Sequence, residues 1–312
     1  MNLKEKILEY LIENETSVSG QKMADLFQVS RGAIWKSIQS LNAEGYEIEG
    51  KNNSGYFIHP VMNIISEKWL QKYLHQPFHI DVLDEVDSTS TYLKKIIDGQ
   101  SIPCLACAYH QSAGRGRTGK SFFSPDNGLY FSLAFKVDEK VDLTMITIKA
   151  GIAVLHALKN IVHKDCQIKW VNDIYYQHKK VCGILSEAMM DFESGKIDSI
   201  IIGIGINLFV DKFPVELEDI ATSLDIKKCN KNLLIASIVN EIMSNCNAMQ
   251  LIHEYKENCI IMNKMVHFKM NGNEYTGLAI DINEKGNLLV KVNDEIMILK
   301  SGEVSLGSKK YE

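Results

Sequence analysis

The sequence lacks the features that mark membrane-spanning and secreted proteins. Its start, MNLKEKILEY, carries charged residues throughout and no continuous apolar stretch, so we expect no secretory signal peptide. The longest apolar run, residues 200–210, is interrupted by glycines and by Asn207 and is far too short for a membrane span. The seven cysteines form an odd, scattered set rather than a disulfide framework. We therefore expect a cytoplasmic protein with no membrane partner.

A metal motif and an excess of positive charge are also missing. Cys104 and Cys107 have C-x-x-C spacing, but no second pair or histidines at zinc spacing accompany them. Core positions on a strand are therefore favoured over a redox or metal role. The 34 basic residues are outnumbered by 39 acidic ones, for a formal net charge of −5. This charge argues against a nucleic-acid coat over the whole chain and leaves room for a local DNA-binding module.

Residues 1–61 have the pattern of a winged helix-turn-helix domain. Apolar residues at helical spacing predict three helices between residues 3 and 41, and alternation after Gly45 predicts a two-stranded ribbon. Ser19 is a candidate N-cap of the second helix, with Met23, Leu26 and Phe27 facing inward. The same pattern also occurs in domains that only bind other proteins, and that alternative stays open.

The third helix and the ribbon offer the side chains suited to DNA. Residues 1–60 hold six basic and eight acidic side chains, so non-specific binding should be weak and specificity should need a dimer. Polar residues nevertheless gather on the exposed side of the third helix and at the ribbon turn, Asn52 and Asn53 included. The predicted DNA-binding residues are Ser30, Arg31, Trp35, Lys36, Gln39 and Lys51.

The rest of the chain has an α+β pattern. Residues 62–261 contain a long apolar-striped helix at 144–162, then consecutive strands between 167 and 210 whose short connections indicate antiparallel hairpins. Helical segments return near 231–258. Residues 262–312 alternate in short segments and predict a small β-barrel-like domain.

The stretch AGRGRTGKS, residues 113–121, matches two phosphate-binding signatures by its letters. It fits both the P-loop pattern G-x-x-x-x-G-K-[ST] and the dinucleotide pattern G-x-G-x-x-G. Both motifs need a helix directly after the glycine turn, because the helix N-terminus holds the phosphate. Here a turn at Pro125 and a strand follow instead, so we predict that neither motif is present.

Without those motifs, the stretch is a glycine loop with three cations: Arg115, Arg117 and Lys120. Such a loop is either a solvated basic surface or an anion clamp that orders around its ligand. In a sheet of hairpins, the ends KWVND (169–173), Lys180 and GIGIN (203–207) can converge on one pocket for a partly anionic ligand. The residues alone predict a small-molecule or acyl-transfer enzyme with an attached regulator.

Several motifs, taken together, resemble the family of bifunctional biotin–protein ligases that also repress the biotin operon. They are DSTS (87–90), QSAGRGRTGK (111–120), KWVNDIYY (169–176), KVCGIL (180–185) and GIGINL (203–208), in this order after a winged helix. The resemblance covers the whole chain. It implies three domains: the winged helix, a central mixed or antiparallel sheet with helices in the biotin/lipoate ligase fold related to class II synthetases, and a C-terminal SH3-like β-barrel.

The resemblance also implies an activity. The family condenses biotin with ATP, which carries Mg²⁺, to biotinyl-5′-adenylate, and passes the biotinyl group to one lysine of a biotin carboxyl carrier protein. Family members bind operator DNA as homodimers with the adenylate as corepressor. No protein-bound metal is expected.

Site residues follow by the same resemblance. The implied catalytic residues are Arg115, Arg117, Lys180 and Asp173, with Asp173 orienting the acceptor lysine or taking its proton. Biotin would be held by Ser88, Thr89, Ser90, Gln111, Gly114, Arg115, Gly116, Arg117, Lys180, Gly203 and Gly205. ATP and the adenylate would be held by Arg117, Lys120, Trp170, Asn172, Lys180 and Asn207.

The sequence departs from the family pattern at a few positions. Ser90 replaces the usual Asn of Ser-Thr-Asn, Val171 replaces the usual Pro of Lys-Trp-Pro-Asn-Asp, and Phe122 stands near a frequent Trp. Thr118-Gly119-Lys120 stands where a second arginine is common.

Two alternative functions remain on the sequence alone. A lipoate or octanoyl ligase has a similar central domain, although the Arg-Gly-Arg loop and the winged helix favour biotin. A transcriptional regulator that senses biotin without catalysis is disfavoured, because the loop arginines and Lys180 are present.

Overall fold

The structure is a computed structural model that describes residues 1–14, 16–51, 54–61, 63–137, 141–190, 195–300, 302 and 304–306. It divides into two compact units. The first contains Met1–Gln76 and Lys228–Ser237, and the second contains Pro77–Lys227 and Ile238–Glu312.

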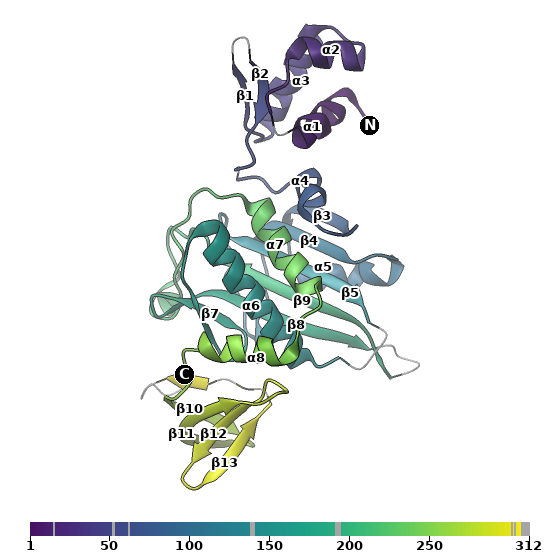
Figure 1. Cartoon of the computed structure of the whole chain (residues 1–312). Helices are drawn as coiled ribbons and strands as arrows, with labels where there is room; N and C mark the ends of the chain where they lie inside the picture. Colours follow the sequence, from purple (N-terminus) through teal and green to yellow (C-terminus); the bar gives the residue numbers. More distant parts are fainter. Residues whose placement is uncertain are drawn as a thin grey trace. The chain divides into compact units, whose positions relative to one another are not determined.

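The first unit contains the predicted winged helix (Figure 1). Its elements are α1 (Leu3–Glu13), α2 (Gly20–Phe27), α3 (Arg31–Ala43), β1 (Ile48–Lys51), β2 (Gly55–Ile58) and α4 (Glu67–Tyr73). Side chains of Asn2, Ser19 and Ser30 accept hydrogen bonds from backbone amides at the starts of α1, α2 and α3. β1 pairs with β2 in antiparallel register. The three predicted helices and the ribbon are therefore confirmed.

The core of this unit corrects one expectation. Met23 is buried and Phe27 packs against the core, as predicted, but Leu26 is 53% exposed. The buried face of α2 is centred on Met23, Ala24 and Phe27, and Leu26 lies about 100° away around the helix. The prediction that Leu26 faces inward is wrong. Trp69 of α4 is buried in the same core.

The second unit is built on a mixed sheet of seven strands in the order β3-β4-β5-β9-β8-β7-β6. The strands are β3 (His79–Val86), β4 (Cys104–Gln111), β5 (Leu129–Lys136), β6 (Gln167–Lys169), β7 (Asp173–Tyr176), β8 (Lys179–Met190) and β9 (Ile197–Ile206). Only β3 and β4 are parallel among these neighbours, and the hairpins β6-β7, β7-β8 and β8-β9 are antiparallel as predicted. The turn between β7 and β8 is at Gln177–His178, whereas the sequence pattern predicts it at His178–Lys179.

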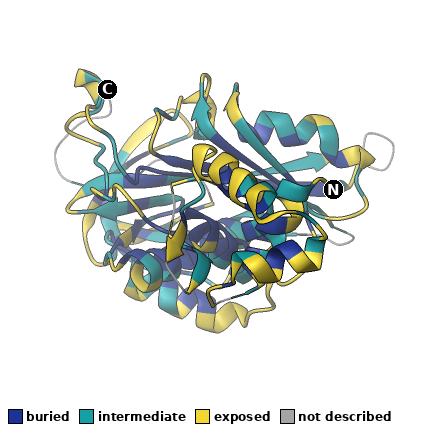
Figure 2. Ribbon diagram, turned by 90° about the horizontal axis from the view of Figure 1, so that it is seen from above, coloured by how far each residue is buried: buried dark blue, intermediate teal, exposed yellow. Residues whose placement is uncertain are grey.

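Helices cover both faces of this sheet. Leu93 of α5 (Thr89–Ile96) packs against Ala106, Ala134 and Ile201 on one face. Ile201 is paired with Glu187, so the next residue, Ser186, points to the other face. There Ser186 accepts a hydrogen bond from Thr147 of α6 (Leu143–Val162), which places α6 opposite α5. The strands between them are largely buried (Figure 2).

Two further helices and a small β-domain complete the unit. The helices are α7 (Lys231–Met243), which the unit shares with the first one, and α8 (Ala248–Glu257). The predicted C-terminal β-domain has the strands β10 (Met265–Met270), β11 (Asn273–Ile282), β12 (Leu288–Val292), β13 (Glu295–Leu299) and β14 (Val304–Leu306), all antiparallel. Short 3₁₀ turns occur at Ile97–Gly99, Arg117–Gly119 and Val215–Leu217.

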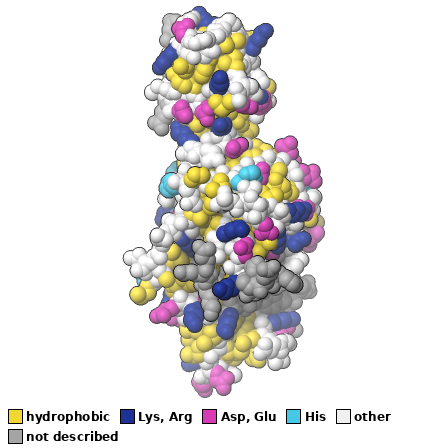
Figure 3. All heavy atoms as spheres, turned by 90° about the vertical axis from the view of Figure 1, so that its right-hand side faces the viewer, with side chains coloured by type: hydrophobic (Ala, Val, Ile, Leu, Met, Phe, Trp, Pro, Cys, Tyr) yellow, Lys and Arg dark blue, Asp and Glu magenta, His cyan; other side chains and the backbone are white. Residues whose placement is uncertain are grey.

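Charge and hydrophobicity are distributed as in a folded domain with a mixed surface. Acidic and basic side chains are interspersed over the face that Figure 3 shows. Among the described residues, α6 alone is long and apolar enough to cross a membrane by length and composition, and 56% of its apolar window is buried within the protein. Its apolar character is accounted for by packing against the sheet.

Three helices meet at His156 of α6. Its Nδ1 atom is 2.7 Å from Glu241 Oε1 of α7, and its Nε2 atom is 2.6 Å from Glu254 Oε1 of α8. Burial lowers the pKa of His156, but hydrogen bonds and charges from the two glutamates outweigh burial and raise the pKa above its usual 6.5.

This raised pKa predicts a pH-dependent contribution to stability. A histidine whose pKa is higher in the folded than in the unfolded state stabilises the folded protein. The full stabilisation is present below about pH 6.5, and it is lost as the pH rises through the folded-state pKa. We expect His156→Gln to lower the melting temperature more at pH 6 than at pH 9. The exposed His253, whose partner Glu257 lies 3.4 Å away on the surface, supplies the control His253→Gln, with little effect at either pH. If His156→Gln lowered the melting temperature equally at both pH values, a raised pKa of His156 in the folded protein would be contradicted.

Candidate active site

The glycine loop folds as a tight hairpin. The Phe122 amide donates to Gly114 O at 2.8 Å, and the Gly116 amide donates to Lys120 O at 2.7 Å. A single 3₁₀ turn, Arg117–Gly119, closes the hairpin, with Thr118 and Gly119 both at positive φ. The next regular element is strand β5 and not a helix. The prediction that this stretch is neither a P-loop nor a dinucleotide fingerprint is confirmed.

A chain of buried polar groups joins this hairpin to α5. Ser132 of β5 lies 2.7 Å from Thr89 Oγ1 and 2.9 Å from Ser90 Oγ. Gln111 at the end of β4 accepts from the Thr89 amide at 3.0 Å and donates to Ser124 Oγ at 3.0 Å. Ser124 in turn donates to Phe122 O at 2.9 Å, so the chain reaches the base of the hairpin.

Three predicted biotin residues, Thr89, Ser90 and Gln111, belong to this chain. Ser88, the fourth, is buried beside it and caps α5 by accepting a 3.5 Å hydrogen bond from Thr91 N. Ser132 and Ser124 were not predicted. The available signal was a serine inside the apolar strand LYFSLAF and another immediately before Pro125.

Glycines let neighbouring segments approach the sheet here. A Cβ atom on Gly203 would lie 2.5 Å from Ser90 Oγ, and one on Gly205 would lie 2.5 Å from the Phe122 ring. Gly114 has the same constraint, because its Cβ would lie 2.5 Å from Phe122 O. Gly203 and Gly205 therefore form a floor on which Ser90 and Phe122 rest.

Cationic and carboxylate groups gather beside the hairpin. Lys180 Nζ is 2.7 Å from Asp173 Oδ1, and Lys180 Nζ also lies 5.8 Å from the centre of the Phe122 ring. Arg117 donates to Asn172 Oδ1 at 3.1 Å, while Asn172 Nδ2 donates to Ile184 O at 2.9 Å. The pairing of Asp173 with Gly183 and of Gly183 with Gly205 brings the three predicted strand ends together. The predicted convergence of the three segments is confirmed, and that they share a ligand pocket stays a prediction.

Two of the residues predicted to hold ATP or the adenylate have other partners. Trp170 is buried, and its indole N–H donates to Gly286 O of the C-terminal β-domain at 2.9 Å. Asn207 donates to Thr222 O at 3.1 Å, and its buried Oδ1 atom has no hydrogen-bond partner among the described residues. An unpaired buried acceptor of this kind is suited to a donor group on a ligand.

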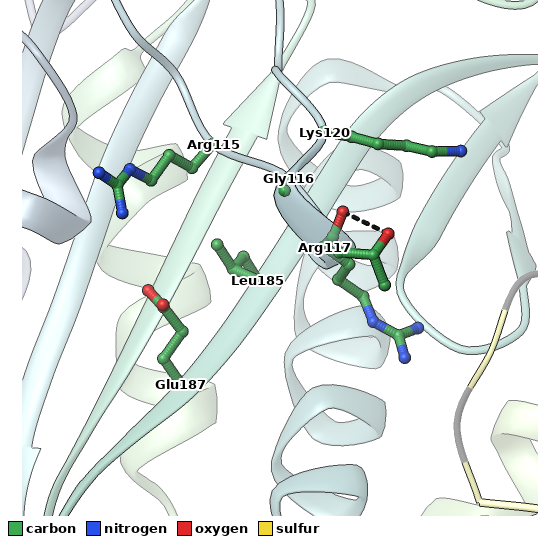
Figure 4. Close-up of a pocket in the computed structure, with 8 residues that line it drawn as sticks. Arg115, Gly116, Arg117, Lys120, Leu185 and Glu187 are labelled. Carbon is green, nitrogen blue, oxygen red and sulfur yellow. Dashed lines mark hydrogen bonds between the residues drawn. The ribbon is translucent and has the colours of Figure 1, made fainter.

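The hairpin and β8 enclose a pocket of about 430 Å³ (Figure 4). It is lined by residues 115–120 of the hairpin and by Leu185 and Glu187 of β8. Arg115 extends from the hairpin on the side of Glu187, whereas Arg117 and Lys120 extend on the opposite side. The roles of Arg115 and Lys120 at the ligands stay predictions.

Burial shapes the ionisation of groups near the site. Burial, followed by the charge of Asp173, raises the pKa of Tyr175 to about 12. Cys104 and Cys107 lie buried in β4, and burial raises the pKa of Cys104 to about 11. These two thiols are core residues, as predicted, and are not reactive thiolates at neutral pH.

The predicted DNA-binding residues are all exposed on the first unit. Arg31, Trp35 and Gln39 follow each other at intervals of four on α3, and Trp35 is 54% exposed. Lys36 and Ser30 are exposed beside them, and the Ser30 hydroxyl accepts from the Ala33 amide. Lys51 is exposed on β1, whereas Asn52 and Asn53 lie outside the described residues.

Comparisons with known proteins agree with this division. The sequence model of the Biotin/lipoate A/B protein ligase family matches residues 82–207. A helix-turn-helix domain model matches residues 4–57, and the Biotin protein ligase C terminal domain matches residues 261–307.

Similar proteins extend over nearly the whole chain. The bifunctional ligase/repressor BirA of Bacillus subtilis is 32% identical over 93% of this chain and 94% of its own length. The bifunctional ligase/repressor BirA of Escherichia coli is 26% identical over 96% of this chain and 95% of its own. The biotin protein ligase of Aquifex aeolicus, solved with biotin and ATP, is 28% identical, with a TM-score of 0.62 over 74% of this chain and 99% of that one. The chain belongs to the family of bifunctional biotin–protein ligases and repressors.

Proposed function

We propose that the second unit forms biotinyl-5′-adenylate from biotin and ATP and transfers the biotinyl group to one lysine of a biotin carboxyl carrier protein. The observation that carries this proposal is the hairpin with Arg117 beside the Lys180–Asp173 pair, over a glycine floor, in a member of the ligase family. In the first step the biotin carboxylate has to approach the phosphates of ATP, and Arg117 and Lys180 would supply the positive charge that these two anions need.

In the first step, a biotin carboxylate oxygen attacks the α-phosphorus of ATP and diphosphate leaves with its magnesium ion. The protein forms no covalent bond to either substrate and acts by alignment and charge. Lys180 would lie between the carboxylate and the α-phosphate, with Arg117 at the phosphate oxygens. Asn207 Oδ1, which has no donor within the described residues, would accept from an adenine amino group.

The polar chain at the other end suits the head group of biotin. A ureido ring has two N–H donors and one carbonyl acceptor, and hydroxyl groups can serve either role. Thr89, Ser90, Ser132 and Gln111 supply such groups on the same side of the sheet as the glycine floor. Ser90 fills the position of the usual family asparagine with a hydroxyl bonded to Ser132.

In the second step, the amine of the carrier lysine attacks the adenylate carbonyl and AMP leaves. The amine must be neutral to attack, so a nearby carboxylate that takes its proton or orients it would assist. Asp173 is the carboxylate in the cluster, and its pairing with Lys180 holds it in place between the steps.

The first unit would make the protein a repressor with the adenylate as corepressor. Ligand-dependent dimerisation would present two α3 helices to a palindromic operator, because half-site spacing mirrors the protein two-fold axis. By linkage, the adenylate would strengthen the dimer by the same factor by which the dimer strengthens adenylate binding. A cytoplasmic location and the absence of a membrane partner belong to the same proposal.

The ligase assay combines protein, biotin, MgATP and an apo carrier domain, with biotinylated carrier detected by mass. We expect product with biotin and none with lipoate. Lys180→Met should slow adenylate formation about 10²–10³-fold, because it removes a cation at the reacting anions. Lys179→Met is the control on the same strand, since the Lys179 ammonium donates to Glu218 O and takes no part in the Lys180–Asp173 pair. Product with lipoate alone would overturn the biotin assignment.

Asp173→Asn separates the two half-reactions. If Asp173 handles the incoming amine, the variant should form adenylate at close to the normal rate and transfer biotin about 10²-fold more slowly. Single-turnover measurements of adenylate formation and of transfer to the carrier check this. An equal loss in both half-reactions would assign Asp173 only to holding Lys180.

The repressor role predicts a gel shift of the protein's own promoter fragment that requires both biotin and ATP. Arg31→Ala should weaken the shift about tenfold, because Arg31 is exposed at the start of α3. Lys6→Ala on α1 is the control for loss of one exposed positive charge. A shift that is indifferent to both ligands would contradict the corepressor.

A further inference from the structure

We propose that Glu187 is a positioning residue that receives the Arg115 guanidinium when the hairpin of residues 114–122 closes over bound biotinyl-5′-adenylate. The inference rests on the proposed ligase function. It gives Arg115 a role different from that of Arg117, although the two arginines are only two residues apart.

Glu187 is placed on the ligand side of the sheet by the strand register. It is paired with Ile201, and Leu185 is paired with Gly203, so Glu187 stands on the same face as the glycine floor. Glu187 and Leu185 both line the pocket beneath the hairpin. A carboxylate at this point faces a loop that carries three cations.

Only half of the Glu187 carboxylate is satisfied. Its Oε1 atom accepts from Lys94 Nζ of α5 at 2.7 Å. Its Oε2 atom is buried and has no hydrogen-bond partner among the described residues. Because a buried carboxylate oxygen without a donor is costly, a donor is expected in some functional state. Lys94 therefore provides a donor to Oε1 of Glu187, and Oε2 lacks a donor among the described residues.

Arg115 is the complementary unsatisfied group. Its guanidinium makes no hydrogen bond or ion pair with any residue that the structure describes, whereas Arg117 is held by Asn172. Figure 4 shows the Glu187 carboxylate rising from β8 on the side of the pocket where the Arg115 guanidinium lies. The other two pocket cations, Arg117 and Lys120, extend on the side of the hairpin opposite Arg115.

The chemistry of the two groups favours their contact. A guanidinium offers planar paired donors, and a carboxylate offers two acceptors in matching geometry. Lys94 holds the carboxylate from the α5 side, so its free oxygen is available to the hairpin side. The resulting contact would join the hairpin to β8 across the pocket.

Closure of this kind serves the intermediate. The adenylate is a mixed anhydride that water destroys, and it has to persist until the carrier arrives. A contact that does not involve the reacting atoms can hold the hairpin of residues 114–122 closed without interfering with the phosphates. Glu187, which is not among the predicted catalytic residues, would therefore govern how long the adenylate stays bound rather than how fast it forms.

The test is the release of preformed adenylate. Protein loaded with labelled biotin and MgATP is freed of excess ligand, chased with unlabelled biotin, and sampled for retained label. We expect Glu187→Gln to release the label about tenfold faster, the effect of losing a charge-assisted hydrogen bond, with the rate of adenylate formation nearly unchanged. Glu187→Asp, which keeps the charge, should recover part of the retention.

Coupling to Arg115 distinguishes this role from a structural one. Arg115→Gln should accelerate release to a similar extent, and the double variant should be no faster than the faster single variant. Lys94→Met is the matched control and should change release less than twofold, since it leaves the Glu187 carboxylate for Arg115. Melting temperatures without ligand identify any variant that is merely unstable.

Three outcomes would count against the inference. Additive effects of Glu187→Gln and Arg115→Gln would show that the two residues act independently. If Lys94→Met and Glu187→Gln accelerate adenylate release equally, Glu187 acts only through its ion pair with Lys94 of α5. If Glu187→Gln releases the adenylate no faster than the wild-type protein does, the closing contact is wrong while the ligase function stands. If the wild-type protein forms no adenylate, the ligase function itself is contradicted.

Discussion

The active site depends on the chain of buried hydroxyl and amide groups that runs from Ser90 through Ser132, Thr89, Gln111 and Ser124 to the base of the hairpin. Each group in it supplies a partner that its neighbour would otherwise lack in a dry interior. The chain connects α5, β4, β5 and the hairpin at one place on the sheet. The hairpin is therefore positioned by polar contacts at its base, while its tip lines the pocket above β8.

The protein brings anions together although its own net charge is negative. It does so by concentrating cations in one short loop and one strand start, over a floor where glycine replaces side chains. The carboxylates near them are paired: Asp173 with Lys180, and Glu187 with Lys94. In the absence of substrates, these carboxylates offset the repulsion between neighbouring cations. The cations can still bind phosphate when the substrates arrive.

Most of the elements were predictable because their signals are local. The helix caps at Ser19 and Ser30, the alternation of the hairpin strands and the turn after the glycine loop all depend on neighbours in sequence. Leu26 was predicted wrongly because a helix of eight residues has few positions to define its buried face. Ser132 and Glu187 were missed because their partners on α5 are far away along the chain.

Local sequence patterns are enough to predict a winged helix, a hairpin-rich central domain and a small β-domain, and to show that AGRGRTGKS is not a helix-capped phosphate loop. Those conclusions follow from periodicity and turn chemistry, which act over a few residues. Only the tertiary structure decided which side chains meet: that Arg117 bonds to Asn172 while Arg115 lies on the side of Glu187, and that the Trp170 indole bonds to the C-terminal β-domain. Strand register and the direction of each side chain fix these contacts, and both are set by packing across the sheet rather than by the order of residues.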